Sequence, residues 1–188
     1  MKQGNKIAGG NPSRGRANQD YYATHPISTH LILEVEEVIY PALEPACGEG
    51  HISRLLQGDV TSNDLIDRGY GNGGINFLTW NPDREYKTVI TNPPFSLFTE
   101  FMEKSLDVAS KKVMLFGKLQ ALEGQRRATK MQKTPLKYVY VFKSRQQPLR
   151  NGSEIDELTG KKMASSTMAF AWFVWEKEYS GEPVIRWI

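Results

Sequence analysis

The stretch Thr91-Asn92-Pro93-Pro94-Phe95 decides how the chain around it folds. It follows an apolar run at residues 88–90 and precedes apolar residues at helical spacing over residues 97–106. This order predicts a strand, a tight loop and a helix. The prolines have fixed φ angles and no N–H group, and Pro93 biases Asn92 towards an extended conformation. We therefore expect a stiff loop at the carboxyl end of a strand, where open α/β sheets bind their ligands.

The polar groups of this loop suit a planar molecule that carries an exocyclic amino group. The Asn92 side-chain oxygen and the Pro93 carbonyl can each accept one amino hydrogen, and the Phe95 ring can stack on the plane. Asn-Pro is also a common turn signal, so the loop taken alone is equally compatible with a simple turn. Since the rest of the chain favours binding, we predict catalytic positions at Asn92, Pro93, Pro94 and Phe95.

A second informative stretch is Leu43-Glu44-Pro45-Ala46-Cys47-Gly48-Glu49-Gly50, which follows a short apolar strand. Gly48 and Gly50 allow the backbone to approach a ligand closely, and we expect the next segment, from Ile52, to be a helix whose free N–H groups point at that ligand. A nicotinamide-binding motif would have a third glycine where Ser53 stands, and no Walker-type phosphate loop occurs. Cys47 is interpreted as a packing residue, because no basic partner lies near it in the sequence.

Residues 60–64 predict a second strand that ends in an acid, Asp64. An acid at this place, opposite a glycine-rich first turn, can bind the two ribose hydroxyls of a nucleoside. The alternative is a turn or helix-capping aspartate. A glycine-rich loop at residues 69–74 follows, and after it Phe77 or Leu78 could form the wall of an adenine pocket.

The order of the elements predicts an α/β fold with one open, mixed and mostly parallel sheet. A helix is expected over residues 27–40, and strand–helix alternation continues to residues 112–116. Strand patterns without helices then occupy residues 137–143, 168–175 and 184–188, so we expect a parallel first part and antiparallel C-terminal strands. Trp172 and Trp175 lie in an apolar run and are expected in the core. The length of 188 residues fits one domain, residues 20–188, preceded by a flexible basic arm at residues 1–19.

Composition places the chain among globular proteins of a reducing cytoplasm. A single cysteine allows no internal disulfide, and no apolar run has the length of a membrane span. We expect no secretory signal, because no apolar stretch follows the first lysines. His25 and His30 have no cysteine or histidine partner at ligand spacing, so no metal site is predicted.

Charge is distributed unevenly, although the net charge is only +3. Residues 20–110 carry five basic and fourteen acidic side chains, whereas residues 111–162 carry thirteen basic and four acidic ones. Such a basic block can be a solvated face, but beside a base-shaped pocket it favours contact with phosphates. The predicted nucleic-acid contacts are Arg126, Arg127, Lys130, Lys143, Arg145, Arg150, Lys161 and Lys162.

Taken together, these motifs resemble the S-adenosylmethionine-dependent amino-methyltransferases, in particular the small phage-type DNA N6-adenine methyltransferases. The hallmark Asp/Asn/Ser-Pro-Pro-Tyr/Phe of that family matches residues 92–95, and its cofactor loop is similar to residues 44–50. The segment Tyr22-Ala23-Thr24-His25-Pro26 looks like the one that holds the methionine end of the cofactor. Residues 124–126 and 171–175 also look like phage-type members, so the resemblance covers residues 20–188.

The resemblance implies a Rossmann-like methyltransferase domain that binds S-adenosyl-L-methionine. The cofactor-binding residues that it implies are Tyr22, Thr24, Pro26, Glu44, Pro45, Ala46, Cys47, Gly48, Gly50, Asp64, Leu65, Asn76, Phe77 and Asn92. The chain departs from the family at Asn76, which follows the expected third strand where an aspartate is usual; its amide oxygen can still accept the cofactor's amino hydrogen. No separate target-recognition domain fits this length, so recognition would fall to the basic loops, to a separate specificity subunit or a homodimer, or be relaxed.

The expected activity is methyl transfer to the N6 amine of adenine in DNA, with the base extruded from the duplex. Cytosine N4, an RNA base or a protein glutamine amide would present a planar NH2 group to the same acceptors, and the basic block favours nucleic acid over protein. Outside enzymes, the chain could be an inactive relative that is kept as a DNA-binding or assembly protein, and the intact Asn92–Phe95 loop argues against this.

Overall fold

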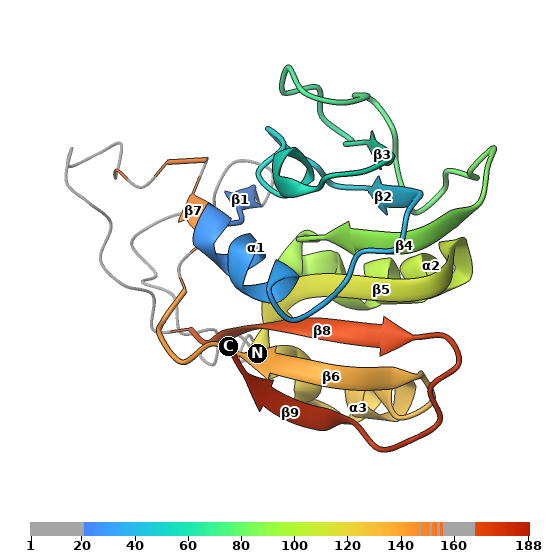
Figure 1. Cartoon of the computed structure of the whole chain (residues 1–188), viewed down its shortest axis with the longest axis vertical. Coiled ribbons are helices and arrows are strands. Elements are labelled where there is room, and N and C mark those ends of the chain that lie inside the picture. The colour runs from blue at the N-terminus through green and yellow to red at the C-terminus, as the bar shows by residue number, and fades with distance from the viewer. Residues whose placement is uncertain (1–20, 147, 151, 154, 156–167) are drawn as a thin grey trace, which may run out of the picture.

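The computed structural model describes residues 21–146, 148–150, 152, 153, 155 and 168–188. The predicted basic arm at residues 1–19 lies outside these residues, as do Lys161 and Lys162. Within the described part, seven strands form one sheet in the order β3-β2-β4-β5-β8-β6-β9 (Figure 1). Their bounds are β2 Ala42–Glu44, β3 Val60–Ser62, β4 Tyr86–Thr91, β5 Ala109–Lys118, β6 Leu136–Val141, β8 Phe170–Glu176 and β9 Val184–Trp187. Two further strands, β1 (Tyr22–Ala23) and β7 (Leu149–Arg150), pair with each other in an antiparallel manner.

Strand direction confirms the predicted mixed sheet. Strands β3, β2, β4 and β5 are parallel neighbours, and β8 is antiparallel to both β5 and β6. The last strand, β9, pairs parallel with β6, so β8 alone is reversed among the seven described strands of this sheet. The carboxyl ends of β2, β3, β4 and β5 therefore meet at one edge of the sheet, as the sequence predicted for the two loops.

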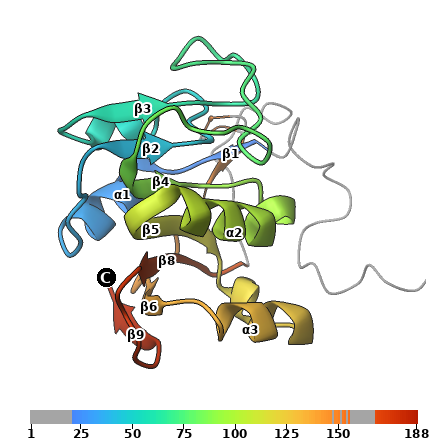
Figure 2. The same ribbon diagram turned by 90° about the vertical axis from the view of Figure 1, so that its right-hand side faces the viewer.

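Helices cover both faces of the sheet (Figure 2). On one face lies α1 (Pro26–Leu33), whose Ile32 is buried against Ile90, Met114 and Trp172 of the sheet. On the other face lie α2 (Phe98–Val108) and α3 (Gln125–Met131), which follow the short 3-10 turns η3 (Phe95–Leu97) and η4 (Leu119–Leu122). Because β5 and β8 are covered on both sides, they read as continuous apolar runs rather than as alternating patterns.

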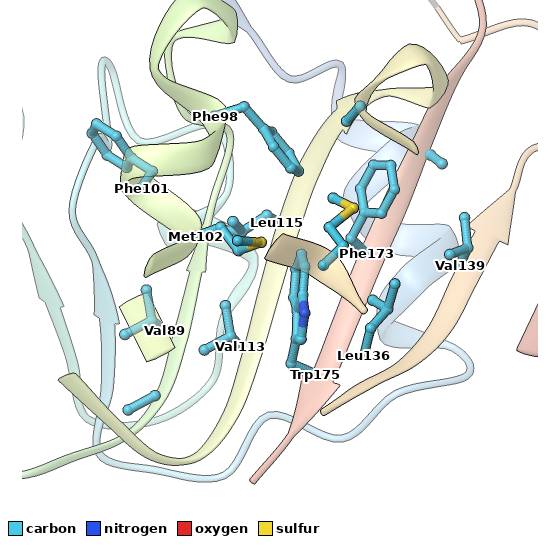
Figure 3. Packing of buried hydrophobic residues seen from close by; sticks show 14 of the residues in the cluster. Val89, Phe98, Phe101, Met102, Val113, Leu115, Leu136, Val139, Phe173 and Trp175 are labelled. Atoms are coloured by element: carbon cyan, nitrogen blue, oxygen red, sulfur yellow. The ribbon is translucent and has the colours of Figure 1, made fainter. Parts of the chain in front are cut away.

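The core beneath α2 fixes the base of the predicted catalytic loop (Figure 3). Helix α2 buries Phe98, Phe101, Met102 and Ser105, which recur at the spacing of one helix face. The ring of Phe98 packs edge-on against Phe173 of β8, with the ring centroids 5.3 Å apart. Truncation of such a buried aromatic ring typically costs about 3–5 kcal/mol of the free energy of unfolding. The loop therefore connects a buried strand to a firmly packed helix.

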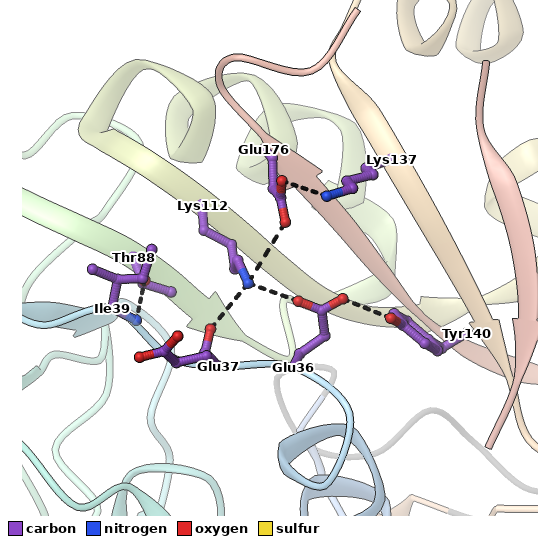
Figure 4. Close-up of polar contacts among 8 residues, drawn as sticks. All are labelled: Glu36, Glu37, Ile39, Thr88, Lys112, Lys137, Tyr140 and Glu176. Carbon is purple, nitrogen blue, oxygen red and sulfur yellow. Dashed lines mark hydrogen bonds and ion pairs between the residues drawn. The ribbon is translucent and has the colours of Figure 1, made fainter. Parts of the chain in front are cut away.

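A buried ionic network joins the segment after α1 to β5, β6 and β8, and its Lys112 lies in the amino-terminal half of β5 (Figure 4). Lys112 Nζ donates to Glu36 Oε2 at 2.7 Å, and Tyr140 Oη donates to Glu36 Oε1 at 2.6 Å. Glu176 adds a second carboxylate, with its Oε1 3.8 Å from Lys112 Nζ. A buried charge is costly unless it is paired, and here each side chain of the Lys112–Glu36 pair is less than one tenth exposed. The network joins the segment after α1 to the sheet.

The helix predicted over residues 27–40 is shorter in the structure, and long-range contacts of this kind explain why. The helix α1 ends at Leu33, well before Tyr40. Beyond it, Glu36 turns towards Lys112 and Tyr140, and the Ile39 N–H donates to Thr88 Oγ1 at 3.1 Å. Residues 34–41 thus make contacts with β4, β5 and β6 instead of continuing the helix.

Two further expectations about local structure were wrong. The segment after Gly50 contains only the 3-10 turn η2 (Ser53–Leu55), because Leu56 adopts an extended conformation and β3 begins only ten residues after Gly50. The strand expected just before Asn76 does not form. The described residues between β3 and Asn76 form turns instead, with one isolated bridge between Asn63 and Asn72. The polar segment at residues 118–135, for which no helix was predicted, contains α3.

Candidate active site

The two predicted loops share one cavity of about 320 Å³ at the carboxyl edge of the sheet. One loop follows β2 and the other follows β4, and these strands are parallel neighbours. The cavity is lined by most of the predicted catalytic and cofactor-binding residues: Tyr22, Thr24, Glu44, Pro45, Ala46, Cys47, Asp64, Leu65, Asn76, Phe77, Asn92, Pro93, Pro94 and Phe95. A nucleoside-sized ligand and a target group can therefore meet in a single space.

Three of the predicted cofactor residues do not line this cavity. Pro26 is the first residue of α1, and Gly48 and Gly50 form the turn behind the lining. Both glycines have positive φ angles, of 53° and 84°. A Cβ atom at Gly48 would lie 2.6 Å from the Tyr21 ring, so this glycine gives room to a tyrosine of the same chain. Direct contact of these three residues with a cofactor stays a prediction.

The two ends of the Asn92 side-chain amide differ in their hydrogen bonding. Its Nδ2 donates to the Tyr22 carbonyl at 2.6 Å, which fixes the amide plane. Its Oδ1 is buried and has no hydrogen-bond partner among the described residues, and Asn92 is one of the residues that line the cavity. An unpaired buried acceptor costs about 1–3 kcal/mol, so such an atom marks a place where a donor binds. A ligand amino group is a donor of the required kind.

Phe95 is part of an aromatic layer beside Asn92. Its ring lies 5.7 Å from the Tyr22 ring at an interplanar angle of 27°, and 5.5 Å from the Phe170 ring. The Lys118 ammonium group lies 4.9 Å from the Phe95 ring centroid. A ring held in this way offers a stacking platform whose position is set by three other side chains.

Asp64 connects the second strand to the glycine turn. Its Oδ2 accepts from the Gly48 N–H at 2.8 Å, and its Oδ1 accepts from the Ile66 N–H at 2.9 Å. Both carboxylate oxygens are therefore used to shape the loops, and each retains a lone pair for a further donor. The carboxylate also lines the cavity, where ribose hydroxyl groups can donate to it.

Glu44 is buried at the floor of the cavity. Its Oε2 accepts from the backbone N–H of Ser53 at 2.8 Å and from the Ser53 hydroxyl group. Burial raises the pKa of Glu44 to about 8, although the Ser53 hydrogen bonds act in the opposite direction. Burial, followed by the nearby Glu44 charge, likewise raises the pKa of the Cys47 thiol to about 12. A thiol that stays protonated is a poor nucleophile, which agrees with the packing role expected for Cys47.

The expected adenine end is formed by Asn76, Phe77 and Leu65. The Asn76 Oδ1 accepts from the Leu78 N–H at 3.1 Å, so the side chain shapes its own turn. Phe77 is buried and packs against the Phe101 ring at 5.2 Å, and it lines the cavity as well. Leu65 is largely exposed at the rim. These residues offer an apolar wall and an amide at one end of the cavity.

Sequence reasoning missed three polar residues that line the same cavity: Tyr21, His51 and Arg68. The Arg68 guanidinium carbon lies 4.0 Å from the centroid of the Tyr21 ring, and Tyr21 Oη donates to Glu49 Oε2 at 3.0 Å. Burial lowers the pKa of His51 below its usual value. None of the three belongs to a spacing pattern, and Tyr21 and Arg68 meet only through the fold.

The cavity lining contains none of Arg126, Arg127, Lys130, Lys143 and Arg145, which are predicted to contact nucleic acid. Arg126, Arg127 and Lys130 belong to α3, Lys143 and Arg145 follow β6, and Arg150 ends β7. Two of them have internal partners: Arg127 donates to the carbonyls of Gln120 and Glu123, and Lys130 forms an ion pair of 2.6 Å with Glu103. Contact of these residues with nucleic acid stays a prediction.

The described residues contain no group of three or more histidine, cysteine, aspartate or glutamate side chains that could hold a metal ion. No helix formed by these residues combines the length and the apolar character that a membrane span requires.

Comparisons at the level of sequence found no match, whereas comparisons of structure found many. No protein-family model and no curated protein matches the chain. A Listeria monocytogenes protein, proposed to be a class I S-adenosylmethionine-dependent methyltransferase, superposes with a TM-score of 0.52 and 15% identity over 96% of this chain and 68% of its own. A dimethyladenosine transferase from Plasmodium falciparum gives a TM-score of 0.55 and 15% identity over 84% of this chain and 64% of its own.

A third structure, the modification subunit of a proposed type I restriction enzyme from Vibrio vulnificus YJ016, gives a TM-score of 0.53 and 11% identity. That comparison covers 91% of this chain but only 48% of the modification subunit, so the chain spans about half of that protein. The likeness of these three structures to the chain is one of fold. They show that the chain has the Rossmann-like fold of the class I S-adenosylmethionine-dependent methyltransferases.

Proposed function

We propose that this protein transfers the methyl group of S-adenosyl-L-methionine to the exocyclic N6 amine of adenine in DNA. One observation carries the proposal: the buried Asn92 Oδ1 lacks a hydrogen-bond partner among the described residues, and Asn92 lines the same cavity as Glu44 and Cys47 of the predicted cofactor loop. A turn without function would have no reason to bury an unsatisfied acceptor at the place where a cofactor loop ends.

The residues present fit the cofactor. Asp64 offers carboxylate lone pairs to ribose hydroxyls, Phe77 offers an apolar wall to the adenine, and Glu44 offers a buried carboxyl group to a cationic amino-acid end. When bound, S-adenosyl-L-methionine supplies an activated methyl group on a sulfonium. The protein then has mainly to provide orientation and charge complementarity, because the donor needs no further activation.

The target amine needs a different kind of help, because its lone pair is delocalised into the adenine ring. Asn92 Oδ1 and the Pro93 carbonyl accept its two hydrogens, which favours a pyramidal nitrogen and exposes the lone pair. Phe95 stacks on the extruded base and keeps it in the plane that these two acceptors require. The Asn92 amide is already oriented by Tyr22, so little reorganisation is needed when the base arrives.

DNA is the substrate that the charges favour. The basic side chains are concentrated in residues 111–162, which carry thirteen basic and four acidic side chains. The Vibrio protein is by its description a modification subunit of a restriction enzyme, and the Plasmodium protein is a dimethyladenosine transferase. We further propose that a separate specificity subunit or a second copy supplies sequence recognition.

Mass spectrometry of methylated products tests the assignment. Unmethylated duplex DNA is incubated with labelled S-adenosylmethionine and the protein, digested to nucleosides and analysed. The proposal predicts N6-methyladenine from wild type and none from Asn92→Ala. The matched control is Asn81→Ala, because Asn81 also precedes a proline but is exposed and lies outside the cavity. N4-methylcytosine as the product would show that the target base is cytosine and not adenine. Methylation of RNA alone would show that the substrate is RNA and not DNA. Cofactor-independent DNA binding without methylation would identify an inactive relative.

A further inference from the structure

We infer that Arg68 binds the carboxylate group at the amino-acid end of the cofactor and thereby sets the direction in which the cofactor lies. This inference rests on the proposed function, since it concerns the same cavity. It assigns a positioning role to a residue that the motifs did not identify.

The charges of the cavity lining lead to this assignment. Glu44 and Asp64 are the acidic side chains among its described lining residues. Burial lowers the pKa of His51, so the imidazole is neutral near pH 7. Arg68 is then the one permanent cation among the described lining residues. S-adenosylmethionine carries two positive groups, the sulfonium and the ammonium, and one negative group, the carboxylate. Arg68 matches that carboxylate in charge.

The position of Arg68 is fixed relative to the glycine turn. Its guanidinium carbon lies 4.0 Å from the Tyr21 ring centroid, and that ring packs against Gly48. Tyr21 is in turn anchored to Glu49, because Tyr21 Oη donates to Glu49 Oε2 at 3.0 Å and accepts from the Glu49 N–H at 3.3 Å. Stacking uses the face of a guanidinium, whereas a carboxylate pairs with its N–H edge.

The backbone on both sides of Arg68 is also constrained. The Ile66 N–H donates to Asp64 Oδ1, and the Gly69 N–H donates to Asp67 Oδ1, each at 2.9 Å. These two short turns hold the arginine at the rim of the cavity, on the side of the glycine turn. Phe77 and Leu78 also line the cavity and offer apolar surface for the adenine. The cofactor would thus lie with its amino-acid end at Arg68 and its adenine at that surface.

Calorimetric titration with two ligands tests the role of Arg68. S-adenosylhomocysteine carries the amino-acid end, and 5′-methylthioadenosine has the same nucleoside and thioether without it. Arg68→Gln should weaken S-adenosylhomocysteine binding by about 10- to 100-fold, as expected for a charge-assisted hydrogen bond, and leave 5′-methylthioadenosine binding within about 2-fold. Arg68→Lys should retain part of the affinity. Arg54→Gln is the matched control, because Arg54 stacks on Tyr70 at 4.4 Å but does not line the cavity.

Each outcome of this titration has a separate meaning. If Arg68→Gln binds S-adenosylhomocysteine as wild type does, or loses both ligands by the same factor, the inference is wrong. If wild type binds neither ligand, the proposed function itself fails.

A second hollow, of about 160 Å³, carries an independent inference. It shares Phe95 with the cofactor cavity, and its described lining has two basic residues and no acidic one. The lining residues are Phe95, Ser96, Phe98, Thr99, Lys118, Gln120, Ala121 and Arg127. We propose that this hollow holds a backbone phosphate of the strand that bears the target base, and this also rests on the proposed function.

The place of Lys118 supports a phosphate site. Lys118 ends β5, which is the parallel neighbour of β4, so its side chain lies beside the catalytic loop. Its ammonium group is 4.9 Å from the Phe95 ring, the platform on which the base would stack. Arg127 is held nearby, with its Nε donating to the Glu123 carbonyl at 2.9 Å. Hydroxyl groups of Ser96 and Thr99 complete a lining of the kind that contacts phosphates.

Steady-state methylation at several salt concentrations tests the phosphate site. Lys118→Met should raise the KM for DNA about 10-fold and reduce the salt dependence of DNA binding by about one ion, with S-adenosylhomocysteine affinity unchanged. Lys87→Met is the control, because Lys87 is exposed near the start of β4, at the opposite edge of the sheet. An unchanged salt slope in Lys118→Met contradicts the inference, and so does a lower kcat at constant KM. Absence of methylation by wild type contradicts the proposed function instead.

Discussion

The side-chain amide of Asn92 donates through Nδ2 to the backbone carbonyl of Tyr22 at 2.6 Å, across 70 residues of sequence. This bond joins the segment expected to hold the methionine end of the cofactor to the loop expected to hold the target base. It also uses the amide nitrogen, so Oδ1 is left as the end of the amide without a hydrogen-bond partner among the described residues.

Asn92→Asp should therefore be harmful in this chain, although an aspartate can accept the same amino hydrogens. An ionised carboxylate would place an oxygen where Nδ2 now meets the Tyr22 carbonyl, so two acceptors would face each other. We expect a loss of about 1–3 kcal/mol in the free energy of unfolding and a reduced methylation rate. Denaturant titration and rate measurement check this. Wild-type stability and rate in Asn92→Asp would show that the Tyr22 contact has no such role.

Alanine substitutions at two glycines with positive φ angles distinguish the effect of backbone strain from that of a steric clash. Gly74→Ala imposes strain alone, because its φ is 77° and no heavy atom lies within 4 Å of the added Cβ. Gly48→Ala adds a clash with the Tyr21 ring at 2.6 Å. We expect about 1–2 kcal/mol of destabilisation for Gly74→Ala with normal S-adenosylhomocysteine affinity. Gly48→Ala should lose more stability and most of that affinity, as measured by thermal unfolding and calorimetry. Equal effects of the two substitutions would count against the role of the Tyr21–Gly48 contact.

The raised pKa of Glu44 predicts a stability that falls as pH rises. Burial moves the pKa from an ordinary value of 4.5 to about 8, so between these values the folded state keeps a proton that the unfolded chain has released. The stabilisation is complete below about pH 4.5 and is lost as pH rises towards 8. Relative to Glu44→Gln, which cannot titrate, wild type should lose unfolding free energy across this range. Parallel pH profiles of the two proteins would contradict the assignment.

The ionic network around Lys112 should affect stability and not chemistry. Lys112→Met leaves the Glu36 carboxylate buried without its cation, which should cost about 3–5 kcal/mol of the free energy of unfolding. The double substitution Glu36→Gln with Lys112→Met should recover part of this loss, because no buried charge remains. Denaturant unfolding of the single and double variants measures the coupling. Additive losses would show that the pair is not coupled.

The parts of the site that could be predicted from sequence are those defined by short spacing. The Asn92–Phe95 loop and the Glu44–Gly50 turn each lie directly after a buried strand, and parallel strands bring their carboxyl ends together, so a shared cavity followed. Trp172 and Trp175 were expected in the core from their apolar run, and both are fully buried. These features depend on local pattern and on one rule of sheet topology.

The parts that could not be predicted depend on contacts between distant residues. Helical spacing over residues 27–40 gave no sign that Glu36 would turn to Lys112, which lies 76 residues further along. The stacking of Arg68 on Tyr21 likewise arises only when β3 and the segment before β1 approach the glycine turn. Side-chain packing of this kind depends on the assembled fold, and neither residue type nor periodicity predicts it.

The central claim is that Asn92 Oδ1 accepts a hydrogen from the amine that becomes methylated. The most direct test is the single-turnover rate of methyl transfer at saturating DNA and S-adenosylmethionine, for Asn92→Ala and for the matched surface variant Asn81→Ala. The account predicts a loss of about 100- to 1,000-fold for Asn92→Ala, as for other positioned polar groups, and a wild-type rate for Asn81→Ala. A rate for Asn92→Ala within a few-fold of wild type would contradict it.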